Sequence, residues 1–250
     1  MIEPITYAGG GMLGDFIHQL SVVQENFLTT GRKGRVYVSN RHESFRFGVE
    51  RAHADLSPIL SGQDYVESFH PHADESFDVD LGAWRQSPLL FRADWRTVFE
   101  TTYTVPWGAH KWLTLPENEE YANAILVGTK KWQPAADWEF LRHLPGALFV
   151  TDNQEELDHL QAAARRNLST KLLPNLYELY RAIHSCRLFV GALSAPLAAA
   201  MAAHRPCVYL RSHAVGPDVC DVCVEGLPWT HFRVVDRDPV REIKQLLEAT

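Results

Sequence analysis

The stretch from Ile2 to Asp15, IEPITYAGGGMLGD, decides the fold of this chain. An apolar run ends at Tyr7 and enters a glycine-rich turn, after which apolar residues recur at helical spacing: Leu13, Phe16, Ile17, Leu20, Val23 and Phe27. This order predicts a strand, a tight turn and an amphipathic helix. The turn glycines, Gly9, Gly11 and Gly14, allow a ligand close to the main chain. Free N–H groups at the start of the helix favour phosphates or other anions.

Composition narrows the class of protein. The 250 residues are 46% hydrophobic and carry a net charge of −7, which predicts a folded chain with one large core or two smaller ones. An acidic chain without a Lys- or Arg-rich run is a poor nucleic-acid binder, because phosphates require a basic surface. No apolar run reaches the roughly 18 residues of a membrane span, and the first residues lack the basic flank of a signal peptide. With 4 cysteines in all, we expect a cytoplasmic protein without a disulfide framework.

Strand-like and helix-like segments alternate along both halves of the chain. After the opening unit we expect strands at 35–39, 65–69 and 77–81. In the second half the expected order is strand 124–127, helix 135–144, strand 147–151, helices 154–166 and 176–185, strand 188–191, helix 195–204 and strand 207–210. Repeated βα units favour parallel sheet. We therefore predict a compact α/β protein with two Rossmann-like domains, residues 1–116 and 120–250, which face each other across a cleft.

Several motifs follow one another along the chain in a fixed order. In the first half they are Gly11-Met-Leu-Gly-Asp15, Asp64-Tyr-Val66 and Phe77-Asp-Val-Asp-Leu81. In the second half they are the segments 127–132, 148–152, 176–191 and 194–208. Taken together, these motifs resemble the heptosyltransferase family of B-fold (GT-B) glycosyltransferases over nearly the whole chain. The first half is similar to the acceptor domain of that family, and the second half is similar to its nucleotide-sugar donor domain.

The resemblance implies an inverting glycosyltransferase that moves a sugar from a nucleotide-sugar to a hydroxyl of a glycan or glycolipid, without an essential metal or other cofactor. Such a transfer needs a base for the acceptor proton and positive charge for the departing diphosphate. Asp15 resembles the catalytic carboxylate of the family. Gly11, Gly14 and His18 would form the acceptor or phosphate loop, with His18 one turn beyond Asp15 on the same helix face. The expected donor-binding residues are Thr129, Lys130, Lys131, Ser194, Ala195 and Pro196.

Each of these features also has an interpretation without chemistry. An acidic residue in the first helical turn stabilises a helix by itself, which would account for Asp15. A histidine on a partly buried face is commonly a structural polar residue, and a Lys pair at a strand end is commonly a solvated loop. Ser194 and Pro196 have the spacing of an ordinary helix N-terminus.

Two regions of the sequence are compatible with more than one interpretation. Where the family carries Asp-Ser-Gly-Pro followed by His, this chain has Leu193-Ser-Ala-Pro-Leu197, so a non-catalytic sugar- or nucleotide-binding module of the same fold is an alternative. The segment from Trp84 to Trp112 combines tryptophans with basic residues. Its indole rings would form an acceptor surface on which sugars stack, or else belong to the hydrophobic core.

Three short motifs compete with this interpretation. Asp78-Val79-Asp80 has the pattern with which metal-dependent A-fold glycosyltransferases hold a divalent ion. Separately, a glycolipid acceptor is compatible with peripheral membrane contact. Cys220 and Cys223 have zinc-ligand spacing, with His213 or His231 as further ligands. The glycine turn also matches a dinucleotide-binding pattern, for which Arg41 would select NADP in an oxidoreductase.

Overall fold

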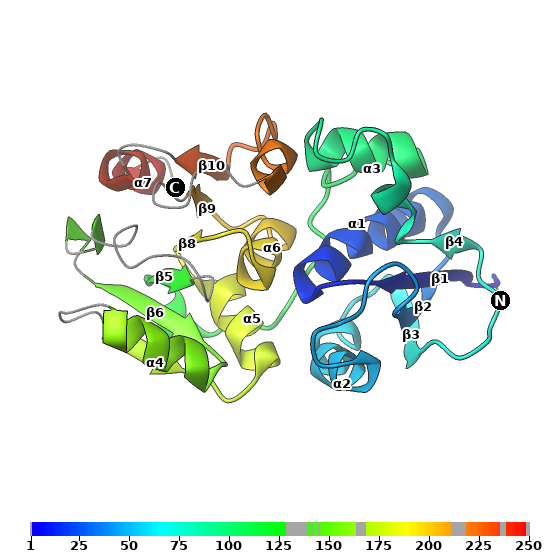
Figure 1. Ribbon diagram of the computed structural model, residues 1–250, viewed down its shortest axis with the longest axis horizontal. Helices are drawn as coiled ribbons and strands as arrows, with labels where there is room; N and C mark the ends of the chain where they lie inside the picture. The colour runs from blue at the N-terminus through cyan, green and yellow to red at the C-terminus, as the bar shows by residue number, and fades with distance from the viewer. Residues whose placement is uncertain are drawn as a thin grey trace. The chain divides into compact units, whose positions relative to one another are not determined.

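The computed structural model describes residues 2–128, 140–141, 143–144, 146–163, 169–211, 219–235 and 239–248. It consists of two compact units, Met1–Leu115 and Pro116–Thr250. Figure 1 shows the helices and strands of both units. Within the described residues, none of the helices is long and apolar enough to cross a membrane.

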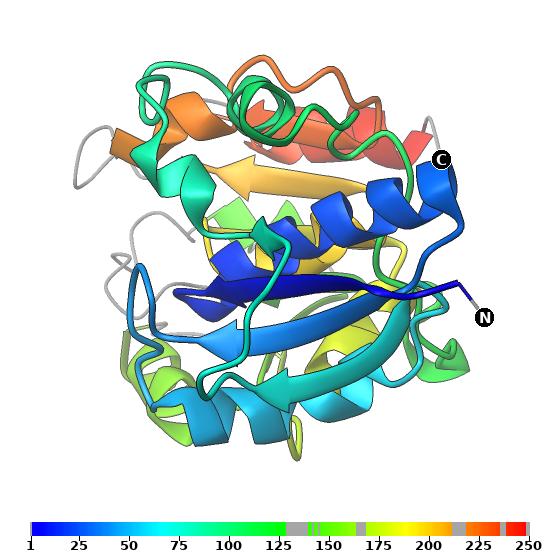
Figure 2. The ribbon, with the colours of Figure 1, turned by 90° about the vertical axis from the view of Figure 1, so that its right-hand side faces the viewer.

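The first unit is built on a parallel sheet of strands β1 (Ile5–Gly10), β2 (Gly34–Ser39), β3 (Val66–Pro71) and β4 (Val79–Asp80). Their spatial order is β3-β2-β1-β4, and Figure 2 shows β1, β2 and β3 side by side. The chain therefore moves from β1 to one side of the sheet and later returns to the other side of the same strand. This topological switch point, between the carboxyl ends of β1 and β4, is where open α/β sheets bind ligands.

Three helices and a short 3₁₀ turn accompany this sheet: α1 (Leu13–Thr30), α2 (Val49–Leu60), η1 (Ala83–Gln86) and α3 (Trp95–Tyr103). The predicted opening helix is confirmed as α1, which buries its apolar face and ends at Gly31 in the left-handed conformation. The sequence did not predict α2 or α3. Asp94 begins α3 by accepting a hydrogen bond from the main-chain nitrogen of Thr97 at 3.0 Å.

The tryptophans between residues 84 and 112 belong to the core of this unit. Trp84, Trp95, Trp107 and Trp112 are all buried, and the indole N–H groups of the last two donate to main-chain oxygens of α1. Ring contacts with Phe99 of α3 connect three of them. Buried rings cannot stack on a sugar, so the prediction that they form an acceptor surface is wrong.

The second unit contains a parallel sheet of six strands in the order β10-β9-β8-β5-β6-β7. The strands are β5 (Ile125–Gly128), β6 (Ala147–Thr151), β7 (Ser169–Leu172), β8 (Leu188–Gly191), β9 (Cys207–Leu210) and β10 (Phe232–Val235). Counted from β5, this is the strand order of a complete Rossmann sheet, with its switch point between β5 and β8. The first unit has the same order over four strands.

Helices and 3₁₀ turns alternate with these strands: η2 (Glu119–Tyr121), α4 (Gln154–Ala163), α5 (Leu176–Ser185), α6 (Ala195–Ala202), η4 (Val219–Cys223) and α7 (Pro239–Glu248). The predicted elements at 147–151, 176–185, 188–191 and 207–210 are confirmed with their bounds, whereas β7, β10 and α7 were not predicted. The predicted helix at 135–144 lies largely outside the described residues. The predicted α/β class with two Rossmann-like units is confirmed.

Candidate functional site

The glycine turn after β1 brings the main chain close to other groups. A Cβ atom on Gly10 would lie 1.9 Å from the main-chain oxygen of Ser39, and one on Gly9 would lie 2.4 Å from the side chain of Gln19 in α1. Gly11 has a φ of 106°, which L side chains rarely adopt. Because only glycine fits here, α1 begins close against the sheet and presents Gly14 and Asp15 in its first turn.

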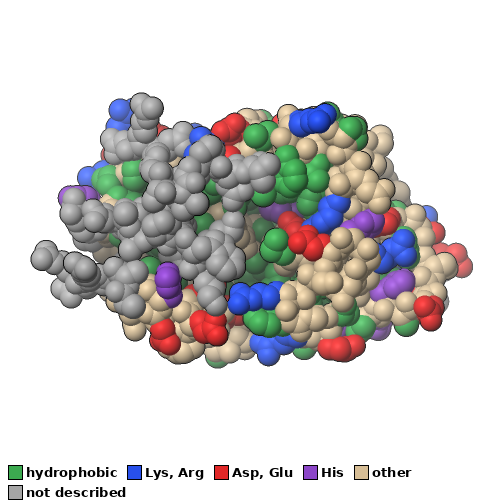
Figure 3. All heavy atoms as spheres, in the orientation of Figure 1, with side chains coloured by type: hydrophobic (Ala, Val, Ile, Leu, Met, Phe, Trp, Pro, Cys, Tyr) green, Lys and Arg blue, Asp and Glu red, His purple; other side chains and the backbone are tan. Residues whose placement is uncertain are grey.

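Asp15 is part of an ion-paired cluster at the switch point. The Nη2 atom of Arg85, in η1 after β4, donates to Oδ2 of Asp15 at 2.6 Å and to Oε2 of Glu43 at 2.7 Å. Glu43 lies in the loop after β2. The cluster therefore joins three segments, α1, the loop after β2 and η1, which follow β1, β2 and β4. Figure 3 shows acidic, basic and histidine side chains together on the face of this unit that is turned to the viewer.

Burial and neighbouring charges change the pKa of Asp15. The pKa of Asp15 is raised above its ordinary value, chiefly because burial penalises the charged carboxylate. The positive charge of Arg85 acts in the opposite direction, and the negative charge of Glu43 reinforces the rise. Asp15 is thus a stronger base than an exposed aspartate while it stays paired with a cation. This combination suits a carboxylate that accepts a proton.

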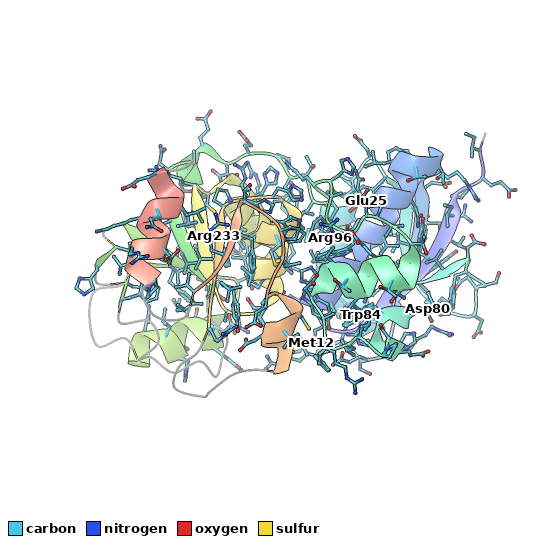
Figure 4. The ribbon with its side chains drawn as sticks, turned by 90° about the horizontal axis from the view of Figure 1, so that it is seen from above. Met12, Glu25, Asp80, Trp84, Arg96 and Arg233 are labelled. Atoms are coloured by element: carbon cyan, nitrogen blue, oxygen red, sulfur yellow. The ribbon has the colours of Figure 1, made fainter. Side chains whose placement is uncertain are left out.

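A second acid–base pair lies at the same end of the sheet. Nε2 of His42 is 3.0 Å and 2.9 Å from the two carboxylate oxygens of Asp80, the last residue of β4. The N–H of Gly82 donates to the same carboxylate at 2.9 Å, and a Cβ on Gly82 would lie 2.1 Å from the His42 ring. Asp80 and Trp84 both lie beside α3 (Figure 4), where the Tyr103 hydroxyl donates to the main-chain oxygen of Asp80.

His18 occupies a different environment from Asp15. Its side chain is buried between the rings of Trp95 and Trp107, at centroid distances of 5.8 Å and 5.7 Å. Burial lowers the pKa of His18 to about 3, so the ring is uncharged at neutral pH. These contacts fit the structural interpretation of His18, and its role toward an acceptor stays a prediction.

The competing metal motifs do not form ligand clusters among the described residues. Asp78 accepts hydrogen bonds from the main-chain nitrogen and the hydroxyl of Thr6, both at 2.8 Å, whereas Asp80 is paired with His42. Hydrogen bonds from Thr6 lower the pKa of Asp78, which stays a carboxylate that ties β4 to β1. No group of three metal-binding side chains occurs in the part of the chain that the structure describes, and His213 lies outside it.

Arg41, the residue of the dinucleotide alternative, is half exposed. Its Nε atom is 4.0 Å from Oδ2 of Asp80, and its guanidinium group lies over the Phe77 ring at 4.9 Å. Arg41 follows β2 in the chain, as the dinucleotide interpretation requires. Its guanidinium group, however, already contacts a carboxylate and an aromatic ring.

The switch point of the second unit lies between Gly128 at the end of β5 and Gly191 at the end of β8. A Cβ on Gly191 would lie 2.5 Å from the Phe189 ring, and the N–H of Ala192 donates to the Gly128 oxygen at 3.4 Å. Three of the predicted donor-binding residues, Thr129, Lys130 and Lys131, follow Gly128 in the sequence and lie outside the described residues.

Ser194 stands at the predicted N-cap position of α6, with Ala195 and Pro196 in the first turn. Its hydroxyl does not cap the helix and instead donates to the main-chain oxygen of Ala192 at 3.0 Å. The prediction of the position is thus confirmed, but the expected side-chain cap is absent. The first N–H groups of α6 receive no side-chain oxygen from Ser194, and a helix N-terminus of this kind attracts anions.

The starts of α5 and α6 differ in whether a side chain caps the helix, and this difference predicts different effects on stability. Asn175 does cap its helix, α5, because its Oδ1 accepts from the main-chain nitrogen of Glu178 at 2.9 Å. We expect Asn175→Ala to lower the free energy of unfolding by about 1 kcal/mol. Ser194→Ala should lower it by less, because no cap is lost. Urea denaturation of the two variants measures the difference, and a larger loss for Ser194→Ala would contradict this assignment of the caps.

Sequence reasoning missed the partners of Asp15. Arg85 is one of the basic residues between Trp84 and Trp112, and no sequence pattern distinguishes it, Glu43 or His42 from their neighbours. All three follow the carboxyl ends of strands that the sequence did predict, at 35–39 and 77–81. The signal that would have found them is the rule that ligand-binding residues gather at the switch point, applied to those two strand ends.

No protein-family model and no curated protein matches this sequence. Solved structures do match it. E. coli heptosyltransferase WaaC with ADP is 15% identical, with a TM-score of 0.63 and coverage of 98% of this chain and 99% of that chain. The fold is that of the heptosyltransferases.

Two further solved structures agree. The E. coli ADP-heptose lps heptosyltransferase II is 14% identical, with a TM-score of 0.63 over 98% of this chain and 99% of that chain. A glycosyl transferase of family 9 from Veillonella parvula is 13% identical, with a TM-score of 0.58 over 100% of this chain and 92% of that chain. The GT-B fold that the sequence motifs implied is therefore confirmed.

Proposed function

We propose that this protein transfers a sugar from a nucleotide-sugar donor to a hydroxyl of a glycan or glycolipid acceptor, with inversion and without an essential metal ion. One observation carries the proposal: Asp15 is a partly buried carboxylate with a raised pKa, paired with Arg85, at the switch point of a parallel sheet. Ligands of open α/β sheets bind at this point. The fold shared with heptosyltransferases supports the same class of reaction.

In the proposed reaction Asp15 is the general base. The acceptor oxygen forms a bond to the anomeric carbon of the donor sugar while its O–H proton passes to Asp15. The bond between the anomeric carbon and the diphosphate breaks, and its electron pair leaves with the diphosphate. Arg85 binds Oδ2 of Asp15, so Oδ1 is the oxygen that we expect to accept the proton. Attack and departure on opposite faces of the sugar produce inversion.

We assign the donor to the second unit. Lys130 and Lys131 follow β5 in the chain together with Thr129, and cationic side chains at that place would neutralise the departing diphosphate. The uncapped start of α6, at Ser194, Ala195 and Pro196, would supply main-chain N–H groups. One of the matched structures is heptosyltransferase WaaC with ADP, and another is an ADP-heptose lps heptosyltransferase, so adenosine diphosphate is the first nucleotide to test.

We assign the acceptor to the first unit, beside Gly11, Gly14 and Asp15. A glycolipid acceptor would bring the protein to a membrane surface, and a nucleotide-sugar donor favours the cytoplasm. The expected cleft between the two units and the non-catalytic alternative both stay predictions. The changed Ser194-Ala-Pro196 segment motivates that alternative.

Thermal-shift measurements with ADP, UDP, GDP and their sugar derivatives test the proposal, followed by an assay of nucleotide release. A ligand that binds only the folded protein raises its melting temperature. Stabilisation by one nucleotide-sugar together with nucleotide release supports a transferase. Stabilisation without release from any donor would favour the binding module. Stabilisation by NADPH alone would favour the oxidoreductase.

Removal of metal ions gives a further prediction. Because Lys130, Lys131 and a helix N-terminus would neutralise the diphosphate, we expect transfer to continue in EDTA at an unchanged rate. The measurement is nucleotide release before and after chelation. Complete loss of release, restored by magnesium or manganese, would contradict the prediction and return Asp78 and Asp80 to consideration as ligands.

A further inference from the structure

One nitrogen atom of Arg85 serves two carboxylates. Nη2 donates to Asp15 and to Glu43, and Nε also reaches the same oxygen of Glu43 at 3.3 Å. The exposed fraction of the side chain is 14% for Arg85, 22% for Asp15 and 41% for Glu43. Arg85 is therefore the least exposed of the three side chains, and Glu43 is the most exposed. An ion pair that is partly removed from water is stronger than an exposed one, because water screens it less.

The local structure holds Arg85 in place. Its guanidinium carbon lies 4.3 Å from the centroid of the Trp84 ring, which is buried against α3. Gly11 is also close to this group, since a Cβ on Gly11 would lie 2.3 Å from Nη2. The missing side chain at Gly11 thus leaves the space in which the Arg85 guanidinium group reaches Asp15. A planar group fixed in this way loses little entropy when it binds a carboxylate.

We propose that Arg85 is a positioning residue for Asp15 and that Glu43 is its counter-ion, so that the three side chains together fix the orientation and the basicity of the proton-accepting carboxylate. This inference rests on the proposed function in giving Asp15 that role. Arg85 alone would hold Asp15 as a weakly basic carboxylate. Glu43 shares the guanidinium charge and so preserves the basicity that Asp15 gains from burial.

The charges of Arg85 and Glu43 have opposite effects on the pKa of Asp15. A nearby cation favours the charged carboxylate and lowers the pKa of Asp15, whereas a nearby anion raises it. The other charged groups at this end of the sheet, His42, Asp80 and Arg41, form a separate set of contacts with one another. Replacing Arg85 or Glu43 by a neutral residue should therefore shift the titration of Asp15 in opposite directions.

The test follows the carboxyl-carbon NMR resonance of Asp15 as a function of pH in the full-length protein without any ligand. We expect Arg85→Gln to raise the pKa of Asp15 by about one unit or more, and Glu43→Gln to lower it by a few tenths of a unit, about the change expected for a partly exposed neighbour. In Arg85→Lys, which keeps the positive charge, the pKa of Asp15 should lie closer to its wild-type value than in Arg85→Gln. Arg96→Gln, which removes an exposed Arg–Glu pair of α3, is the control and should leave Asp15 unchanged.

A titration of Asp15 that is the same in Arg85→Gln, Glu43→Gln and the wild type would overturn the inference. A rise in Glu43→Gln would also overturn it. Glu43 is the most exposed of the three residues, so its variant gives an answer even where Arg85→Gln fails to fold. The measurement needs no donor or acceptor. If a protein with the expected shifts releases no nucleotide, the proposed function is refuted, whereas the effects of Arg85 and Glu43 on the pKa of Asp15 still hold.

Where a donor is found, turnover provides a second readout. The acid limb of the pH profile of kcat follows the ionisation of the base in the bound enzyme. We expect this limb to move to higher pH in Arg85→Gln and to lower pH in Glu43→Gln. A purely structural role would reduce the amount of active protein without moving the limb.

Discussion

Asp15→Asn is expected to reduce the turnover of sugar transfer by about a hundredfold or more while donor affinity stays nearly constant. The asparagine keeps the size of the side chain but cannot accept the proton of the acceptor hydroxyl. Arg85 keeps its contact with Glu43 in this variant, so the loop after β4 retains one of its anchors. Nucleotide release gives the turnover, and calorimetric titration with the donor gives the affinity.

The control for this variant is Asp74→Asn, which removes an exposed carboxylate from the same unit. It should leave turnover and affinity unchanged. An Asp15→Asn protein with near-normal turnover would remove Asp15 from the mechanism. In that case His42, held by Asp80, would be the next proton acceptor to test, because it lies at the same end of the sheet.

Replacement of both Lys130 and Lys131 by alanine is the second change with a large expected effect. If these cations meet the donor diphosphate, the double variant should bind nucleotide-sugar more weakly by a few kcal/mol, as charge-assisted hydrogen bonds in a partly desolvated site are lost. Donor binding by the wild type should also weaken as salt is added. Isothermal titration calorimetry at two salt concentrations measures both effects.

Two further variants make this experiment specific. Lys244→Ala, an exposed residue of α7, removes a lysine from the same unit and should leave donor affinity unchanged. Arg41→Ala should also have no effect, because Arg41 lies in the other unit and is engaged by Asp80. An NADP enzyme would show the reverse, with tight NADPH binding that depends on Arg41 and not on the lysine pair. That pattern would rule out the glycosyltransferase assignment.

The sequence pattern predicted those helices and strands whose local conformational preference agrees with their place in the tertiary structure. The strands at 147–151, 188–191 and 207–210 are continuous apolar runs, and they were predicted with their bounds, as was the helix at 176–185. The sequence did not reveal α2, which contains Pro58, or α3, which is rich in threonine and aromatic residues of modest helix propensity. Packing stabilises these helices more than their own composition does.

The sequence by itself determined the glycine turn, the carboxylate at the start of α1 and the α/β class, because each depends on neighbours a few residues apart. The partners of Asp15 were decided only by the tertiary structure. Arg85 is 70 residues from Asp15 and 42 from Glu43 along the chain, and no local pattern relates them. They meet because the crossover places β4 beside β1, and the parallel pairing of β2 with β1 brings the loop after β2 to the same edge. The burial that makes Asp15 basic and the Trp84 ring that holds Arg85 both arise from that packing, which exists only in the folded chain.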